Sequence, residues 1–178
     1  MPLPGPIVRD ATDRDAQECA AIYALYVTDT AITFEEVPPS PAEMAQRIVT
    51  AARAHAWLVL EDDGRVVGYA YGRSFNPRAA YRWTCEVSVY LEHGRRRTGA
   101  GRALYEALLA RLVQRGFRTA VAAMTLPNDA SVGLHASMGF APVGILRRVG
   151  WKHGAWHDVA WVQRELAADL SDAPAEPT

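Results

Sequence analysis

The sequence predicts a single α/β domain in which helices cover both faces of a mixed central sheet. The first observation is the order of candidate elements, β-α-α-β-β-β-α-β-α-β-β, where three consecutive strands precede an alternation of strands and helices. The second is a β-branched strand that runs through a glycine-rich loop directly into an amphipathic helix. The third is composition: 178 residues with 49% apolar and 22% charged residues suit one domain with a full core. We expect the domain to cover residues 1–166, followed by a flexible C-terminal tail at 167–178.

The first half of the chain predicts one strand, two helices and a hairpin. Thr12 with Asp15 and Ser40 with Glu43 have the spacing of capping boxes, so we expect a helix to begin after each pair. A turn at 62–65 joins two apolar runs and indicates a hairpin. The expected elements are a strand at 7–9, a helix at 16–27, a loop at 28–39, a helix at 40–53, and strands at 57–61 and 66–73.

The second half predicts strands that alternate with helices and then a final pair of strands. In the strand at 84–91, side chains should alternate between the two faces, so Cys85 and Val87 face away from Glu86. The helix after the glycine-rich loop should end near Gly116. The remaining expected elements are a strand at 119–124, a helix at 127–139, and strands at 143–149 and 157–165.

The glycine-rich loop has the features of an anion site. Gly99 and Gly101 allow a tight turn and a close approach of backbone N–H groups to a ligand. The following helix start contributes partial positive charge, and the arginines at 95–97 and Arg102 add full charges. No Lys-Ser/Thr follows the glycines, which excludes a nucleoside-triphosphate P-loop, and Leu104 replaces the third small residue of a dinucleotide fingerprint. We expect a phosphate-bearing ligand here.

Composition and charge exclude several other classes. A formal net charge of −1 argues against a general nucleic-acid binder. No stretch approaches the roughly 20 apolar residues of a membrane span, and the start has no signal-peptide pattern, so we expect a cytoplasmic protein without a membrane partner. Cys19 and Cys85 are far apart in apolar surroundings, which predicts buried free thiols and no metal site.

Two motifs then resemble one superfamily. Arg96-Arg-Thr-Gly-Ala-Gly101 matches the Arg/Gln-x-x-Gly-x-Gly/Ala loop of the GCN5-related N-acetyltransferases (GNAT), whose element order is also the one predicted above. The run from Asn128 to Phe140 matches their Asn-x-x-(Ala/Ser)…Gly-Phe segment, with His135 where most members carry a tyrosine. That histidine, with the runs at 81–86, 126–129 and 151–158, resembles phosphinothricin and methionine sulfoximine N-acetyltransferases over about residues 7–165.

This resemblance implies the GNAT acyl-CoA N-acyltransferase fold and transfer of an acetyl group from acetyl-CoA, as cosubstrate, to a small amino-acid-like amine. Such a transfer must deprotonate the amine, stabilise an oxyanion and receive a thiolate, and it requires no metal. By resemblance, Glu86 is the general base, directly or through water; the structural alternative is an ion pair with an arginine such as Arg78 or Arg82. His135 would help to deprotonate the amine, position the thioester or protonate the thiolate, and the sequence leaves these roles open, together with a purely structural Glu–His pair.

The resemblance and the loop chemistry together assign binding residues. We expect the strand to offer backbone groups to the pantetheine arm, the loop amides to hold the pyrophosphate, and Asn128 to contact the pantetheine or acetyl region. The predicted cofactor-binding residues are Val87, Val89, Tyr90, Leu91, Arg96, Arg97, Thr98, Gly99, Ala100, Gly101, Arg102, Asn128 and Ser131. The predicted acceptor-binding residues are Phe34, Glu35, Arg78 and Tyr81.

Three matters stay open in the sequence. Arg82 replaces the acidic residue of the herbicide-detoxifying members, which puts phosphinothricin itself in doubt as the preferred acceptor. The family forms dimers, which implies a homodimer, with His153, Trp156 and His157 structural or at the subunit contact, and a substrate role as the alternative. The alternative functions are acetylation of a polyamine, an aminoglycoside or a peptide N-terminus, and a non-catalytic acyl-CoA-binding sensor; the missing Lys-Ser/Thr argues against a nucleotide-binding switch.

Overall fold

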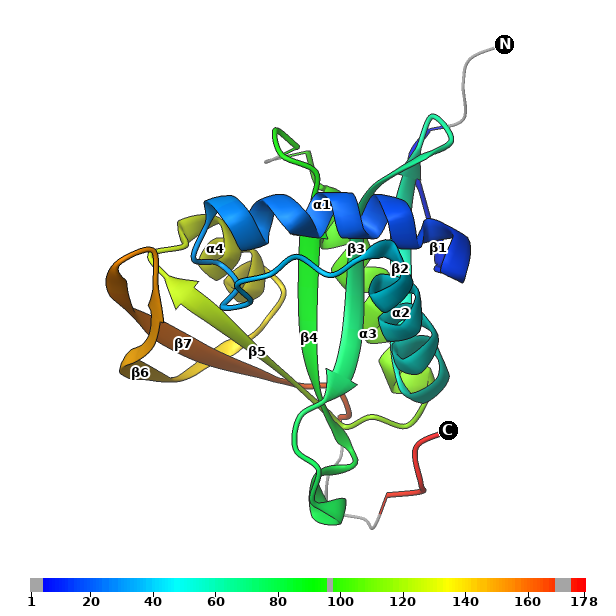
Figure 1. The fold of residues 1–178 in the computed structure, drawn as a ribbon. Helices are drawn as coiled ribbons and strands as arrows, with labels where there is room; N and C mark the ends of the chain where they lie inside the picture. The colour runs from blue at the N-terminus through cyan, green and yellow to red at the C-terminus, as the bar shows by residue number, and fades with distance from the viewer. Residues whose placement is uncertain (1–4, 96–97, 169–173) are drawn as a thin grey trace.

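A computed structural model describes residues 5–95, 98–168 and 174–178, and in these ranges seven strands form one sheet in the order β1-β2-β3-β4-β5-β7-β6 (Figure 1). The β4–β5 pair is parallel and the other pairs are antiparallel, so the predicted mixed sheet is confirmed. The strands are β1 (Ile7–Asp10), β2 (Ala56–Asp62), β3 (Arg65–Ser74), β4 (Thr84–Leu91), β5 (Thr119–Leu126), β6 (Ala141–Lys152) and β7 (Ala155–Glu165). The helices are α1 (Ala16–Asp29), α2 (Pro41–Ala54), α3 (Ala100–Gln114) and α4 (Asp129–Ser137), with short 3-10 turns η1 (Asp13–Asp15) and η2 (Ala79–Tyr81).

The expected helix starts form as capping boxes. Ser40 Oγ accepts from the Glu43 N–H at 3.2 Å, and the Glu43 carboxylate accepts from the Ser40 N–H at 2.7 Å. At the earlier start, the Thr12 N–H donates to the Asp15 carboxylate at 2.8 Å. Both pairs are local in sequence, which is why the sequence alone predicts them.

The last two strands are longer than predicted. They form a hairpin that continues to Lys152 and returns at Ala155, where the sequence suggested ends at 149 and 157. The turn residues His153 and Gly154 have φ angles of 51° and 72°, the positive values that a tight two-residue hairpin turn requires. Histidine is not a residue typical of that turn, so the local sequence gives a weak signal for its position.

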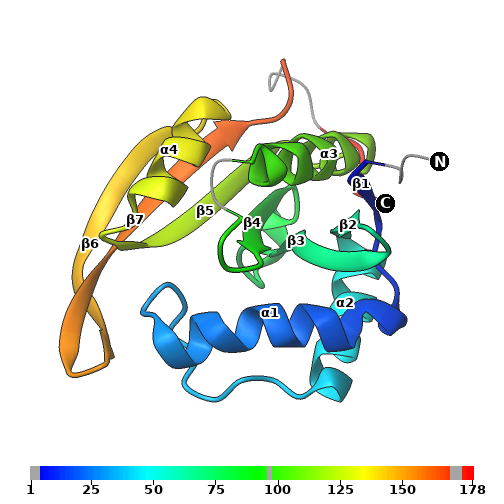
Figure 2. The ribbon, with the colours of Figure 1, turned by 90° about the horizontal axis from the view of Figure 1, so that it is seen from above.

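Helices cover both faces of the sheet, as predicted. Helices α1 and α2 lie on one face, and α3 and α4 lie on the other (Figure 2). On the α3 side, Leu104, Leu108 and Leu112 are fully buried against the strands. On the α1 and α2 side, Met44 and Ile48 pack in a second apolar cluster. Apolar clusters therefore lie on both faces of the sheet, with β4 contributing Cys85 and Val87 to the cluster on the α3 side.

Strands β4 and β5 pair only at one end. Thr84–Glu86 pair with Thr119–Val121, after which the two strands diverge toward the upper side of Figure 1. Within the described residues, positions 87–91 of β4 have no β5 partner, while β5 pairs with β7 along its whole length. The strand backbone beyond Glu86 is therefore available to a ligand on that side.

The described end of the chain lies against the start of β4. Arg82 donates to both carboxylate oxygens of Glu176 at 2.7 Å, and its guanidinium lies 3.8 Å from the Trp83 ring centroid. The Trp83 indole N–H donates to the Ala175 carbonyl at 2.8 Å. Arg82 is thus engaged in a surface contact with the last residues of the chain.

Among the helices of the described ranges, none combines the length and apolar character needed to cross a bilayer.

Candidate active site

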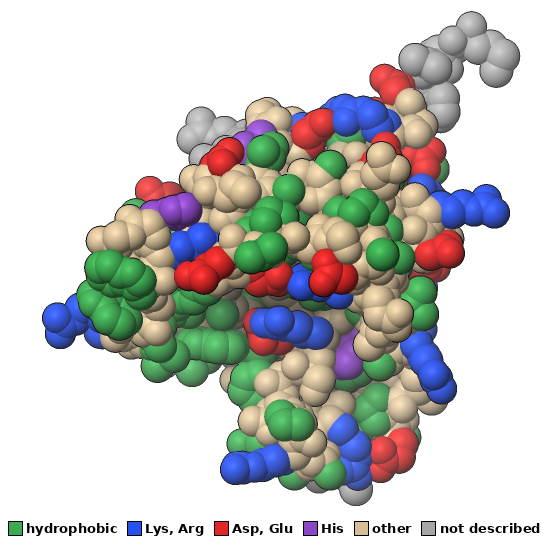
Figure 3. All heavy atoms as spheres, viewed as in Figure 1, with side chains coloured by type: hydrophobic (Ala, Val, Ile, Leu, Met, Phe, Trp, Pro, Cys, Tyr) green, Lys and Arg blue, Asp and Glu red, His purple; other side chains and the backbone are tan. Residues whose placement is uncertain are grey.

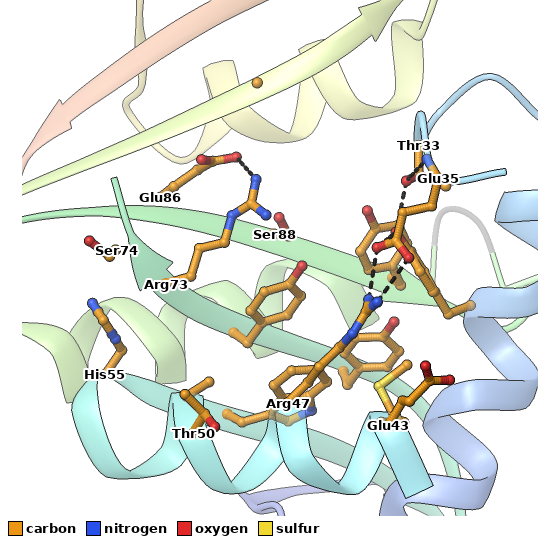
Figure 4. Close-up of a pocket in the computed structure, with 18 of the residues that line it drawn as sticks. Thr33, Glu35, Glu43, Arg47, Thr50, His55, Arg73, Ser74, Glu86 and Ser88 are labelled. Carbon is orange, nitrogen blue, oxygen red and sulfur yellow. Dashed lines mark hydrogen bonds and ion pairs between the residues drawn. The ribbon is translucent and has the colours of Figure 1, made fainter. Parts of the chain in front are cut away.

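A cavity of about 1090 Å³ lies on the α1 and α2 face of the sheet, between α2, the segment 32–35 and strands β3 and β4 (Figure 4). Its floor is aromatic: Trp57 stacks on Tyr71 at 4.4 Å and on Tyr69 at 5.1 Å between ring centroids. Its aromatic lining residues are Tyr23, Phe34, Trp57, Tyr69, Tyr71 and Tyr90. The cavity therefore offers an apolar surface beneath the charged groups described next.

Two arginine–carboxylate pairs face the cavity (Figure 4). Arg73 Nη2 donates to Glu86 Oε1 at 2.6 Å, and the Glu86 side chain is only 12% exposed. Across the cavity, Arg47 donates to both oxygens of Glu35 at 2.7 and 2.9 Å. Each of these two arginines and its carboxylate partner fix one another's orientation, and Glu43 adds a third carboxylate to the cavity lining.

Glu86 has an arginine partner, as the structural alternative supposed, but the partner is Arg73 and not Arg78 or Arg82. Arg73 lies directly opposite Glu86 in the β3–β4 register, whereas Arg82 pairs with Glu176. Neighbouring Cys85 is fully buried on the opposite face, as alternation predicted, and burial raises the pKa of its thiol to about 12.

The predicted acceptor residues divide into two groups. Phe34 and Glu35 line the cavity; the hydrogen bonds from Arg47 lower the pKa of Glu35 against the opposing effect of burial. Arg78 and Tyr81 do not line it. They lie at η2, where the Tyr81 ring packs edge-on against Phe75 at 5.5 Å.

The sequence analysis missed both cavity arginines, Arg47 and Arg73. Arg47 belongs to a stripe on α2 formed by Glu43, Arg47, Thr50 and Ala54, all of which line the cavity. Their spacing of three and four residues places them on one helix side, beside the buried stripe that includes Met44. This stripe beside the buried face of α2 is the sequence signal that could have identified Arg47 as a site residue.

A second, smaller hollow of about 50 Å³ lies between the diverging parts of β4 and β5, and we call it the strand gap. Its lining includes predicted cofactor residues of β4 and α4 together with His135 of α4 and Tyr105 of α3. Four residues border both the hollow and the larger cavity: Ile32, Ser88, Tyr90 and Ala123. The strand gap is therefore adjacent to the cavity. The complete lining is Ile32, Val87, Ser88, Val89, Tyr90, Tyr105, Ala123, Met124, Asn128, Ser131 and His135.

His135 is buried, with 3% exposure, and both of its ring nitrogens have partners. Nδ1 lies 2.7 Å from the Ser131 carbonyl oxygen. Because a carbonyl only accepts, Nδ1 carries the proton and Nε2 accepts from the Tyr105 hydroxyl at 2.9 Å. Burial lowers the pKa of His135, outweighing the hydrogen bond to Ser131, which keeps the imidazole neutral at physiological pH. Tyr105, which the sequence analysis did not single out, is thus part of this site.

Glu86 and His135 border different parts of the site. Glu86 lines the large cavity and His135 lines the strand gap, and no hydrogen bond joins them in the described chain. Asn128 caps α4 by accepting from the Ser131 N–H at 3.2 Å, which places its side chain at the edge of the gap. The gap therefore brings together Asn128, Ser131 and His135, but not Glu86.

The glycine-rich loop connects the end of β4 to the N-terminus of α3. Gly99 is the N-cap in a left-handed conformation (φ 82°), which favours glycine. A Cβ on Gly101 would lie 3.1 Å from Leu134, so this position allows α3 and α4 to approach closely. Arg102 contacts Glu106 and the Ser137 carbonyl. The predicted contacts of Arg96 and Arg97 lie outside the described residues.

Comparison with known proteins agrees with this geometry. The family described as "Acetyltransferase (GNAT) domain" matches residues 8–161. The chain is 37% identical to a phosphinothricin N-acetyltransferase of Streptomyces viridochromogenes, covering 96% of this chain and 93% of the relative. It is 35% identical to an L-methionine sulfoximine/L-methionine sulfone acetyltransferase of Pseudomonas aeruginosa, covering 89% and 94%. A GNAT superfamily phosphinothricin acetyltransferase from Sinorhizobium meliloti, solved in complex with acetyl-CoA, superposes with a TM-score of 0.92 at 37% identity, covering 97% and 95%.

Proposed function

Because this chain belongs to the GNAT acetyltransferase family, we propose that it moves the acetyl group of acetyl-CoA to the amino group of a small amino-acid-like acceptor of the phosphinothricin or methionine sulfoximine type. The observation that carries the proposal is the contact between two hollows. The strand gap suits a thioester arm, and the cavity beside it suits an acceptor with anionic groups. Ser88, Tyr90 and Ala123 border both, so the two reactants would meet there.

The cavity has the chemistry for an amino acid with a second polar end. Arg47 and Arg73 supply guanidinium groups for the acceptor's carboxylate and for a phosphinyl or sulfoximine oxygen. The aromatic floor suits the methylene chain between these groups. The two guanidinium groups facing the acceptor space disfavour a polycationic acceptor such as a polyamine or an aminoglycoside.

Glu86 is the general base of the proposed reaction. The acceptor arrives as an ammonium and loses one proton to the Glu86 carboxylate, directly or through a water molecule. The amine nitrogen then attacks the thioester carbonyl carbon and the C–S bond breaks. The nitrogen loses its second proton in this step, which balances the proton that the leaving CoA thiolate takes up. Arg73 holds Glu86 toward the cavity at 2.6 Å, so the base is oriented before the acceptor binds.

We assign His135 a positioning role. Its Nδ1–H is held by the Ser131 carbonyl and its Nε2 accepts from Tyr105, so the neutral ring has no free nitrogen for an acceptor amine. The ring holds the Tyr105 hydroxyl at the wall of the strand gap. This arrangement gives the gap a fixed polar group contributed by α3.

Acetyl-CoA is the cosubstrate, and its arm suits the strand gap. The unpaired strand backbone beyond Glu86 offers hydrogen bonds to the pantetheine amides, as one strand does to another. Gly99 at the N-cap of α3 presents first-turn amides to the pyrophosphate. Asn128, at the edge of the gap, is placed to contact the acetyl end.

Release of thiol from acetyl-CoA with a panel of amines tests the function. We expect turnover with phosphinothricin, methionine sulfoximine or methionine sulfone, and none with spermidine, an aminoglycoside or a short peptide. Glutamate serves as the control that lacks the tetrahedral side-chain group. Turnover only with spermidine or the peptide would contradict the acceptor class, and acetyl-CoA binding without turnover of any amine would favour the sensor.

We further propose that the protein is a homodimer formed through the β6–β7 hairpin. Exposed apolar side chains gather there, at the left of Figure 3, and Trp151 and Trp156 lie edge-to-face at 5.4 Å. A patch of this kind is typical of a protein interface. His153 and His157 instead contact backbone carbonyls of Thr30 and Lys152. The exposed apolar residues of the hairpin are Val143, Ile145, Leu146, Val149, Trp151 and Trp156.

Replacing Trp156 by glutamate should convert the dimer into a monomer, because a charge in a desolvated interface is strongly unfavourable. Light scattering after size-exclusion chromatography should give twice the 19.5 kDa chain mass for the wild type and the single-chain mass for the variant. Val113→Glu, at an exposed apolar position on α3, is the matched control and should remain dimeric. A wild-type mass of one chain would contradict the proposal.

A further inference from the structure

The β6–β7 hairpin buries an ammonium group beside the segment that carries Phe34 and Glu35. Lys152, the last residue of β6, is only 5% exposed. The chain has 19 lysine and arginine residues together, and Lys152 is the only lysine among them. A single lysine in an arginine-rich chain, placed where charge is costly to bury, requires a specific set of partners.

Those partners are three backbone carbonyl groups. Lys152 Nζ donates to the carbonyl oxygens of Val27 at 2.7 Å, Thr33 at 2.8 Å and Glu35 at 2.9 Å. An ammonium has three donors, so all three are used, and no ion pair involves Lys152 in the described parts of the chain. A planar guanidinium has a different donor geometry, which gives a physical reason for lysine at this position.

The hairpin holds the same segment at two further points. A Cβ added to Gly150 would clash with the Phe34 ring, so the ring rests directly on the glycine backbone. His153 Nε2 lies 3.2 Å from the Thr30 carbonyl oxygen. Residues 30–35 are therefore fixed from their outer side by the hairpin, with Lys152 as the buried anchor.

The inner side of this segment forms the wall of the cavity. The Thr33 hydroxyl lies 2.7 Å from the Tyr23 hydroxyl, and Tyr23 also donates to the Glu35 carboxylate at 2.9 Å. Glu35 in turn holds Arg47, one of the two cations that face the acceptor space. The backbone that Lys152 binds is thus the backbone that sets the positions of Glu35 and Arg47.

We propose that Lys152 is a positioning residue that fixes segment 30–35 and thereby sets the affinity of the cavity for its acceptor amino acid. Lys152 does not line the cavity, so it acts through the segment and not on the acceptor. The inference rests on the proposed function, because it takes the cavity as the acceptor site.

The kinetic test is Lys152→Met, which keeps the side-chain length and removes all three donors. We expect the acceptor KM to rise about tenfold while the acetyl-CoA KM stays within about twofold, because only one binding site is disturbed. Lys152→Arg, which keeps the charge with a planar head, should not restore the acceptor KM. Arg111→Met, which removes a cation paired with Asp10 on the far end of α3, is the control and should leave both constants unchanged. An unchanged acceptor KM in folded Lys152→Met would overturn the proposal.

Hydrogen exchange of the free protein tests the anchor without any acceptor. In Lys152→Met, peptides covering 30–36 should exchange at least about tenfold faster, while peptides of α3 should match the wild type. If that variant does not fold, Lys152→Gln, which keeps two donors, takes its place in both measurements. Unchanged exchange at 30–36 would overturn the inference, whereas failure of every amine with the wild type would overturn only the proposed function.

Discussion

Replacing Glu86 by glutamine should lower kcat about 10³-fold, within the range that a positioned general base contributes. Glutamine keeps the shape of the side chain but cannot accept the ammonium proton. The amide oxygen still accepts a hydrogen bond from Arg73, which preserves the local geometry around the 2.6 Å contact. The measurement is steady-state thiol release at saturating acceptor, with acetyl-CoA affinity measured separately by calorimetry.

The control for this change is Glu165→Gln, a strand glutamate on β7 that is exposed and outside the cavity. It should retain wild-type kcat. Acetyl-CoA affinity should be the same in both variants and in the wild type, because Glu86 does not line the strand gap. A loss of less than about tenfold in Glu86→Gln would show that the carboxylate only pairs with Arg73, and another group would then have to accept the proton.

Gly99→Val should weaken acetyl-CoA binding by at least about tenfold. Gly99 has a φ of 82°, a conformation that costs an L-residue roughly 1–2 kcal/mol and is least compatible with β-branched side chains. Relief of that strain would move the first-turn amides of α3 away from the positions that suit a pyrophosphate. Calorimetric titration with acetyl-CoA measures the change directly.

Gly64→Val separates backbone strain from ligand binding. Gly64 lies in the β2–β3 turn with a φ of 74°, and an added Cβ at either glycine meets no atom within 4 Å. Both variants should therefore lose a similar free energy of unfolding, whereas only Gly99→Val should lose acetyl-CoA affinity. Equal affinity in the two variants would place the pyrophosphate elsewhere.

The features that the sequence determined by itself are local ones. The capping pairs, the alternation of Cys85 and Glu86 between faces, and the glycine N-cap of α3 each involve residues within four positions of one another. Backbone geometry relates such residues directly, so their pattern is readable along the chain. The order of elements then predicts the mixed sheet, because few topologies accommodate it.

The partners of the polar groups at the site were decided only by the tertiary structure. Arg73 meets Glu86 through the β3–β4 register, Tyr105 meets His135 across two helices, and Lys152 binds carbonyls more than 110 positions earlier. The arginines named as examples of a Glu86 partner, Arg78 and Arg82, are near it in sequence, whereas the actual partner lies on the neighbouring strand. Side chains find partners by register and packing, which depend on the whole sheet and both its helical layers, so proximity in sequence is a poor guide to them.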